Sequence, residues 1–204
     1  GGENGGSADI PAGVTENYPY REDIEAPTFN DENSLTIRED AINSDNAIIV
    51  DVTSGQVLAS RRSKQVIYPA SMTKVMTLLL IMEAIDSGKI GWNDMVTASE
   101  SAAAKGGSQI YLKVGEQMSV TDMLKSIAVS SANDCACAMA EHLAGSEQAF
   151  VDQMNRRAGE LGMGDTHFVN CTGLDDSEDA KNHLTSAHDI ALMSRELLKY
   201  HTDI

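Results

Sequence analysis

Residues 68–88 constrain the fold of this chain more than any other stretch. The segment 68–74 reads YPASMTK and is followed by an almost unbroken apolar run from Val75 to Ile85. A helix formed by this run would be apolar nearly all the way round, which is typical of a buried central helix rather than a surface helix. Pro69 suits the approach to that helix, because its ring fixes φ and it has no N–H that needs a partner. We therefore predict a central helix that carries Ser71 at its start and ends near Gly88.

Ser71 and Lys74 are three residues apart, so both side chains would lie on one face of this helix. A serine hydroxyl becomes a good nucleophile when a base takes its proton, and a lysine amine is such a base once burial lowers its pKa. The positive end of the helix beside Ser71 would also stabilise an oxyanion formed from an acyl substrate. The pair is therefore a candidate nucleophile and base, although the same spacing also arises by chance from a helix cap and a surface lysine.

A second polar group, Ser131-Ala132-Asn133, separates two apolar segments. A hydroxyl and a carboxamide on a short turn surrounded by core can point into the same cavity as Ser71. Ser131 could pass a proton between Lys74 and a leaving amine. Asn133 could hold Lys74 through its amide oxygen and also bind a peptide group of a substrate. Serine and asparagine are common turn residues too, so this triplet by itself also fits ordinary turn chemistry.

The chain divides into an N-terminal segment and one domain. Residues 1–34 hold three of the four prolines, are rich in Gly, Asn and acidic residues, and lack periodicity, so we expect a flexible acidic tether. The domain is expected over residues 35–204. It should begin with two strands and continue with mostly helices. The predicted strands are 47–52 and 57–60, and the predicted helices include 135–143, 146–161 and segments that start at Thr97, Ser119 and Thr185.

Composition and spacing exclude several classes of protein. The net charge of −16 and the lack of a Lys/Arg patch argue against nucleic-acid binding. No apolar run reaches about 18 residues, as a membrane-spanning helix would need. The three cysteines lack a CxxC spacing and are interpreted as small core residues. The histidines form no HExxH pair, and His183 and His188 are expected to be ordinary polar or capping residues. We therefore expect neither a metal nor another cofactor.

Taken together, the motifs resemble those of the D-alanyl-D-alanine carboxypeptidases, the low-molecular-mass penicillin-binding proteins, in which an S-x-x-K motif is combined with an S-x-N motif. The resemblance runs from about Ala47 to the C-terminus. It implies an α+β, penicillin-binding/β-lactamase-like transpeptidase fold, with Ser71 in the cleft between a helical lobe and a sheet lobe. The matching blocks, in order, are DVTSG at 51–55, PASMTK at 69–74, SAND at 131–134, FVDQMN at 150–155, LGMGDTHFVN at 161–170 and TGL at 172–174.

The resemblance also implies a function and its residues. Such an enzyme trims the terminal D-alanine from peptidoglycan stem peptides that end in D-Ala-D-Ala, outside the cytoplasmic membrane of a bacterium. Ser71 would form an acyl-enzyme, with its own backbone N–H as one oxyanion donor, and Lys74 would be the base. Ser131 would relay protons and Asn133 would position the substrate. β-Lactam antibiotics would acylate Ser71 as substrate mimics.

One departure from the family pattern concerns its third motif, Lys-Thr-Gly, on a strand that lines the cleft. The one Thr-Gly in this chain, Thr172-Gly173, follows Cys171 instead. In the family that strand follows the helix with which this chain ends. We therefore expect a C-terminally truncated domain with an incomplete antiparallel sheet and an unpaired edge, any membrane tether lying outside these residues. This puts turnover by the 204 residues alone in doubt.

Four alternatives remain open from the sequence. One is a non-catalytic remnant that binds wall peptide or a partner, and another is a structural lipoprotein or adhesin. The other two are a DD-endopeptidase and a β-lactamase of the same superfamily. The second motif reads Ser-Ala-Asn rather than Ser-Asp-Asn, which argues against a β-lactamase.

Overall fold

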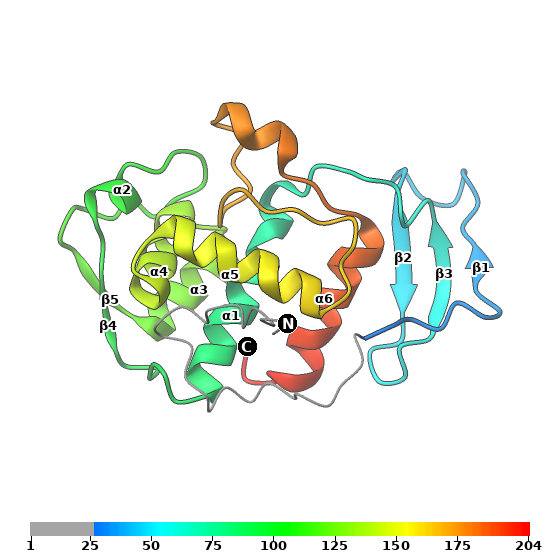
Figure 1. Cartoon of the computed structure of the whole chain (residues 1–204), viewed down its shortest axis with the longest axis horizontal. Coiled ribbons are helices and arrows are strands. Elements are labelled where there is room, and N and C mark those ends of the chain that lie inside the picture. Colours follow the sequence, from blue (N-terminus) through cyan, green and yellow to red (C-terminus); the bar gives the residue numbers. More distant parts are fainter. Residues whose placement is uncertain (1–26) are drawn as a thin grey trace, which may run out of the picture.

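In the computed structural model, which describes residues 27–204, a small sheet lies at one end of the molecule and helices make up most of the remainder (Figure 1). The sheet consists of β1 (Leu35–Thr36), β2 (Ala47–Val50) and β3 (Val57–Arg61), in the order β1-β3-β2. β2 and β3 are antiparallel, whereas β1 pairs with β3 in parallel. The sheet is therefore mixed rather than purely antiparallel as predicted, and β2 forms one of its edges within the described residues.

Contacts with this sheet begin before the predicted domain boundary at residue 35. The backbone N–H of Asn30 donates to Gly55 O at 3.1 Å, and that of Val57 donates to Asn30 O at 2.7 Å. Phe29 is partly buried against the core. Residues 27–34 of the predicted tether thus pack on the folded part of the chain, and residues 1–26 lie outside the described residues.

The turn between β2 and β3 ties the sheet to the last helix, α6 (Ala187–Tyr200). Asp51 Oδ1 accepts hydrogen bonds from the backbone N–H and the hydroxyl of Ser54, at 2.7 and 2.6 Å, which closes the turn. Arg195 of α6 then donates to the carbonyl oxygens of Val52 and Thr53, at 2.7 and 3.1 Å. These bonds fix the sheet against α6 and, through α6, against the helical part.

The helices are arranged around α1 (Lys74–Asp86), which follows a 3-10 turn, η1 (Ala70–Thr73). α6 lies between α1 and the sheet, and α3 and α4 lie on the other side of α1 (Figure 1). α1 is buried on nearly all sides, as the apolar run predicts. The other elements of this part are α2 (Glu100–Ala103), α3 (Val120–Ser130), α4 (Asn133–Ala144), α5 (Glu147–Glu160) and the 3-10 helix η2 (Glu178–Asn182).

Serine caps define where the longer helices begin. The side chains of Ser119, Ser146 and Ser186 accept the N–H of the third residue of α3, α5 and α6, and a cap of this kind contributes about 1 kcal/mol. The predicted start at Ser119 is therefore confirmed, whereas the start at Thr185 is one residue too early. The start predicted at Thr97 is wrong, because Ser99 caps α2 and Thr97 ends a strand.

That strand, β4 (Met95–Thr97), pairs antiparallel with β5 (Gln117–Ser119), and neither strand was predicted. Each strand has three residues, too few for an alternating pattern to emerge. The connection between them contains α2 and the segment 105–112, which folds over the start of α4. Among residues 27–204, no helix combines the length and the apolar character needed to cross a membrane.

One acidic residue lies inside the apolar helix α1. Glu83 is 2% exposed and pairs with Arg157 of α5 at 2.8 Å, and the same guanidinium reaches Glu196 of α6 at 3.0 Å. Removing one partner of such a buried pair costs about 3–5 kcal/mol, because the other charge is left without compensation. The pair therefore fixes α5 and α6 on α1 at one register.

Candidate active site

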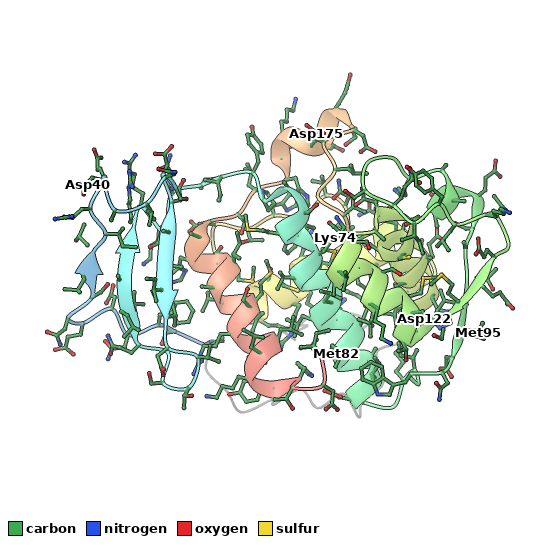
Figure 2. All side chains as sticks on the ribbon, turned by 180° about the vertical axis from the view of Figure 1, so that it is seen from behind. Asp40, Lys74, Met82, Met95, Asp122 and Asp175 are labelled. Carbon is green, nitrogen blue, oxygen red and sulfur yellow. The ribbon has the colours of Figure 1, made fainter. Side chains whose placement is uncertain are left out.

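Ser71 and Lys74 lie where η1 passes into α1, and Figure 2 shows Lys74 at the end of α1 that faces the surrounding loops. Lys74 Nζ is 3.1 Å from Ser71 Oγ, so the structure brings the predicted nucleophile and base into hydrogen-bond contact. The same Nζ donates to the backbone carbonyl of Thr172 at 2.9 Å. Lys74 is 4% exposed, whereas Ser71 is exposed and accessible to a substrate.

Burial changes the acid–base chemistry of Lys74. Loss of hydration lowers the pKa of its amine from 10.5 to about 8 and outweighs the opposite effect of the nearby Cys171. A base with a pKa near the working pH is neutral often enough to accept a proton and strong enough to hold it. The amine is thus suited to take the proton of Ser71 near neutral pH.

The loop 170–174 packs against α1 and holds Lys74 in position. Thr77 of α1 donates its hydroxyl to Cys171 O at 2.7 Å, and Asn170 Oδ1 accepts the N–H of Gly173 at 2.8 Å. Gly173 has φ +85°, and a Cβ at this position would lie 1.8 Å from Ala70 O. Only glycine allows the loop to approach η1 so closely. The Thr-Gly-Leu block at 172–174 therefore has a structural reason, which the sequence did not indicate: it presents Thr172 O to Lys74.

Ser131 and Asn133 lie at the junction of α3 and α4. Ser131 has φ +53°, a left-handed conformation that is costly for a residue other than glycine. Its Oγ is buried and has no hydrogen-bond partner among the described residues, and the same holds for Asn133 Oδ1. Leaving such a group unpaired costs about 1–3 kcal/mol, and strain and unpaired groups of this kind gather at functional sites.

The structure does not make the contact that the sequence suggested between the amide oxygen of Asn133 and Lys74, because this oxygen has no hydrogen-bond partner among the described residues. Asn133 Nδ2 donates to Gly106 O at 2.8 Å, and its backbone N–H donates to Ser108 O at 2.7 Å. The side chain is thereby fixed by the 105–108 loop, with its oxygen left over to accept from another molecule. The segment from Lys105 to Ser108 thus determines how Asn133 is held.

His183 is a residue that sequence reasoning assigned to the ordinary polar class. It is 3% exposed, and its ring nitrogen Nε2 lies 2.6 Å from Thr73 Oγ1, the residue between Met72 and Lys74. Because Nδ1 accepts the backbone N–H of Val169 at 2.9 Å, the neutral ring carries its proton on Nε2 and donates it to Thr73. Burial lowers the pKa of His183 to about 4, which keeps the ring neutral. The histidine therefore fastens η1 to the segment 167–169.

The three cysteines are buried and free, as the sequence predicts for core residues. Burial raises the pKa of Cys135 and of Cys137 to about 12, so neither thiol is a nucleophile near neutral pH. Within residues 27–204, no group of three or more His, Cys, Asp or Glu side chains could hold a metal ion.

A serine and a lysine of lowered pKa one helical turn apart, together with a Ser-x-Asn turn in an α+β fold, are the motifs of the penicillin-binding class of serine peptidases. The chain belongs to the D-alanyl-D-alanine carboxypeptidase family, peptidase family S11, whose sequence model matches residues 33–204. The resemblance stated from the motifs is thereby confirmed.

Individual relatives give the same result. The chain is 51% identical over 154 residues to the D-alanyl-D-alanine carboxypeptidase DacF of Bacillus subtilis and covers 39% of that protein with 76% of its own length. It is 38% identical over 157 residues to DacD of Escherichia coli, again covering 39% of that protein with 74% of its own length. The chain thus spans about two fifths of the length of these curated relatives.

Solved structures confirm the fold class. The D-alanyl-D-alanine carboxypeptidase DacD from Francisella tularensis superposes with a TM-score of 0.75 at 31% identity, over 93% of this chain and 43% of that one. Penicillin-binding protein D2 from Listeria monocytogenes, in its ampicillin-bound form, superposes with a TM-score of 0.68 at 27% identity, over 78% of this chain and 63% of that one.

Proposed function

We propose that this chain carries the acylation site of a serine-type D-Ala-D-Ala carboxypeptidase, with Ser71 as nucleophile, Lys74 as base, Ser131 as proton relay and Asn133 as substrate-positioning residue. One observation supports this most strongly: a buried lysine of lowered pKa lies 3.1 Å from an exposed serine hydroxyl. The identity to DacF and DacD supports the choice of reaction.

In the proposed acylation step, the neutral Lys74 amine accepts the proton of Ser71 as Oγ attacks the carbonyl carbon between the two terminal D-alanines. The oxyanion that forms lies at the start of η1, where the backbone N–H of Ser71 can donate to it. The C–N bond then breaks, and the leaving amine receives the proton from Lys74 through the hydroxyl of Ser131. Terminal D-alanine leaves, and the peptide stays on Ser71 as an ester.

In the deacylation step, water replaces the amine. Lys74 takes a proton from the water molecule as the water oxygen attacks the ester carbon. The bond between Ser71 Oγ and this carbon then breaks, and Lys74 returns the proton to Ser71 Oγ. Throughout, the fixed carbonyl of Thr172 orients the Lys74 amine. Asn133 Oδ1, which has no partner among the described residues, would accept a peptide N–H of the substrate.

The substrate and location follow from the same proposal. A stem peptide of peptidoglycan places the reaction outside the cytoplasmic membrane of a bacterium, and β-lactams would acylate Ser71 because they present a strained amide to the same atoms. The third family motif, Lys-Thr-Gly, has no counterpart in the 204 residues. In the family, the lysine of this motif binds the terminal carboxylate of the substrate, and these residues do not supply it. Acylation by a reactive β-lactam is therefore a more sensitive test than peptide hydrolysis.

The test is covalent labelling with a fluorescent penicillin, followed by peptide mapping. We expect one adduct on Ser71 in the wild-type chain, and none in Ser71→Ala. The matched control is Ser101→Ala, which removes an exposed hydroxyl from α2 and should leave labelling unchanged. His183→Ala is unsuitable as a control, because His183 holds Thr73. A wild-type chain that melts cooperatively and yet is not labelled would refute the proposal and favour a non-catalytic wall-peptide-binding protein.

A relative with a different activity suggests a second assay. The D-alanyl-D-alanine endopeptidase of Pseudomonas aeruginosa is 35% identical over 133 residues. Both reactions would use the same acylation by Ser71 and differ in the group that leaves. Incubation with a linear pentapeptide and with a cross-linked dimer, followed by mass spectrometry, separates them: we expect loss of one D-alanine from the pentapeptide and an intact cross-link.

A further inference from the structure

The carboxylate of Glu147 connects the two loops that support the site, although it does not reach the reacting atoms itself. Glu147 is the first residue of α5, after the cap Ser146, where the helix dipole favours a negative charge. Its side chain is 20% exposed, as is that of its partner Lys105. It belongs neither to the S-x-x-K motif nor to the S-x-N motif.

One oxygen of this carboxylate fixes the 105–108 loop. Glu147 Oε2 pairs with Lys105 Nζ at 2.6 Å, and the two groups strengthen each other: the pKa of Lys105 is raised and that of Glu147 is lowered despite their burial. The next residue along the chain, Gly106, accepts the hydrogen bond from Asn133 Nδ2 at 2.8 Å. The ion pair therefore determines where the carbonyl that orients Asn133 lies.

The other oxygen fixes the 170–174 loop. Glu147 Oε1 accepts from the thiol of Cys171 at 3.3 Å and faces its backbone N–H at 3.4 Å. The next residue, Thr172, presents the carbonyl that binds Lys74. The thiol of Cys137 also donates to Glu147 Oε2, at 3.6 Å, so the described charged and titratable partners of this carboxylate are one ammonium group and two neutral thiols.

The two loops and Asn133 lie close together at Gly107. A Cβ on Gly107 would lie 2.9 Å from Asn133 Nδ2 and 3.0 Å from Leu174 Cδ2, so the two loops and Asn133 are packed without spare room. A side chain larger than glycine at position 107 would therefore push on both Asn133 and Leu174. A single carboxylate that binds both is placed to set their common geometry.

We propose that Glu147 is a positioning residue for the acylation site, holding Gly106 O against Asn133 through Lys105 and Thr172 O against Lys74 through Cys171. This inference rests on the proposed roles of Lys74 and Asn133. It predicts that loss of the carboxylate charge loosens both carbonyls, admits water to Lys74 and slows acylation, while α5 keeps its cap and its packing.

The test compares Glu147→Gln with the wild-type chain and with Glu100→Gln, which neutralises an exposed carboxylate at the matching first position of α2. The first readout is the lysine Cε resonance in a chain labelled with 13C-lysine, assigned to Lys74 by its loss in Lys74→Arg. We expect the titration midpoint of Lys74 to rise by about half a unit or more in Glu147→Gln, because water returns to the amine. It should stay unchanged in Glu100→Gln.

The second readout is the rate of labelling by a fluorescent penicillin, which should fall about tenfold or more in Glu147→Gln and stay unchanged in Glu100→Gln. If Glu147→Gln does not fold, Lys105→Met removes the same ion pair from the loop side and carries the test. An unchanged Lys74 midpoint in a folded variant would overturn the inference. Absence of labelling in the wild-type chain would instead overturn the proposed function, and the resonance would still report on Glu147.

Discussion

Replacing Lys74 by methionine should make the protein more stable while abolishing acylation. Methionine has nearly the length of lysine without its charge, and Lys74 is 4% exposed. The lowering of its pKa from 10.5 to about 8 measures the cost of burying the ammonium group. That shift corresponds to a destabilisation of about 3 kcal/mol at neutral pH.

The substitution also removes a favourable contact. Thr172 O loses the donor at 2.9 Å, which costs about 1 kcal/mol or somewhat more. The expected net gain is therefore about 2 kcal/mol, or roughly 4–8 °C in Tm for a domain of this size. Thermal and urea unfolding at neutral pH, followed by circular dichroism, measure both quantities.

The pH dependence of stability tests the burial cost of Lys74 more specifically than stability at one pH. The pKa of Lys74 is lower in the folded protein than in the unfolded chain, so between about 8 and 10.5 the unfolded chain binds more protons. Stability of the wild-type protein therefore rises with pH through this window, and the penalty is fully present below it. The advantage of Lys74→Met should shrink by about 3 kcal/mol between the two ends of the window. The exposed control Lys113→Met should show no such trend. A Lys74→Met variant that is less stable than wild type near neutral pH, or whose advantage does not change with pH, would refute this reasoning.

Two further predictions concern residues that hold the site. His183 is buried and neutral, with a pKa of about 4 against 6.5 in the unfolded chain, so the unfolded chain binds more protons between these values. Stability should fall by about 3 kcal/mol as the pH drops through that window, and urea unfolding of His183→Gln should show a flatter dependence. Gly173→Ala should cost more than about 4 kcal/mol or prevent folding, because its Cβ would overlap Ala70 O at 1.8 Å. Gly145→Ala is the matched control: it has the same φ of +85° but open space around the Cβ, so it should cost only about 1 kcal/mol in the same unfolding assay. Equal losses for the two glycine variants would show that close approach is not the reason for Gly173.

The parts of the site that sequence reasoning found are those that lie within one helical turn or one short break. The apolar run after Ser71 predicts a buried helix, and the three-residue spacing then places Lys74 beside the hydroxyl. Ser131 and Asn133 were proposed as site residues because they interrupt two apolar helices, and the structure places both at the junction of α3 and α4.

The parts that it missed depend on contacts between distant segments. Thr172 lies 98 residues from Lys74 and His183 lies 110 residues from Thr73. A backbone carbonyl leaves no side-chain signal in a sequence, and a lone histidine is more often an ordinary polar residue than a support for a nucleophile. The partner of the Asn133 amide nitrogen was missed for the same reason, since Gly106 contributes only a backbone carbonyl.

The most direct test of the account is the pH dependence of penicillin labelling at Ser71, with the adduct located by peptide mapping at each pH. If Lys74 in its neutral form is the base, the labelling rate should rise with pH and level off above a midpoint of about 8, and the adduct should lie on Ser71 throughout. A rate that does not change with pH across this midpoint, or an adduct on any other residue, would contradict the assignment of Lys74 and Ser71.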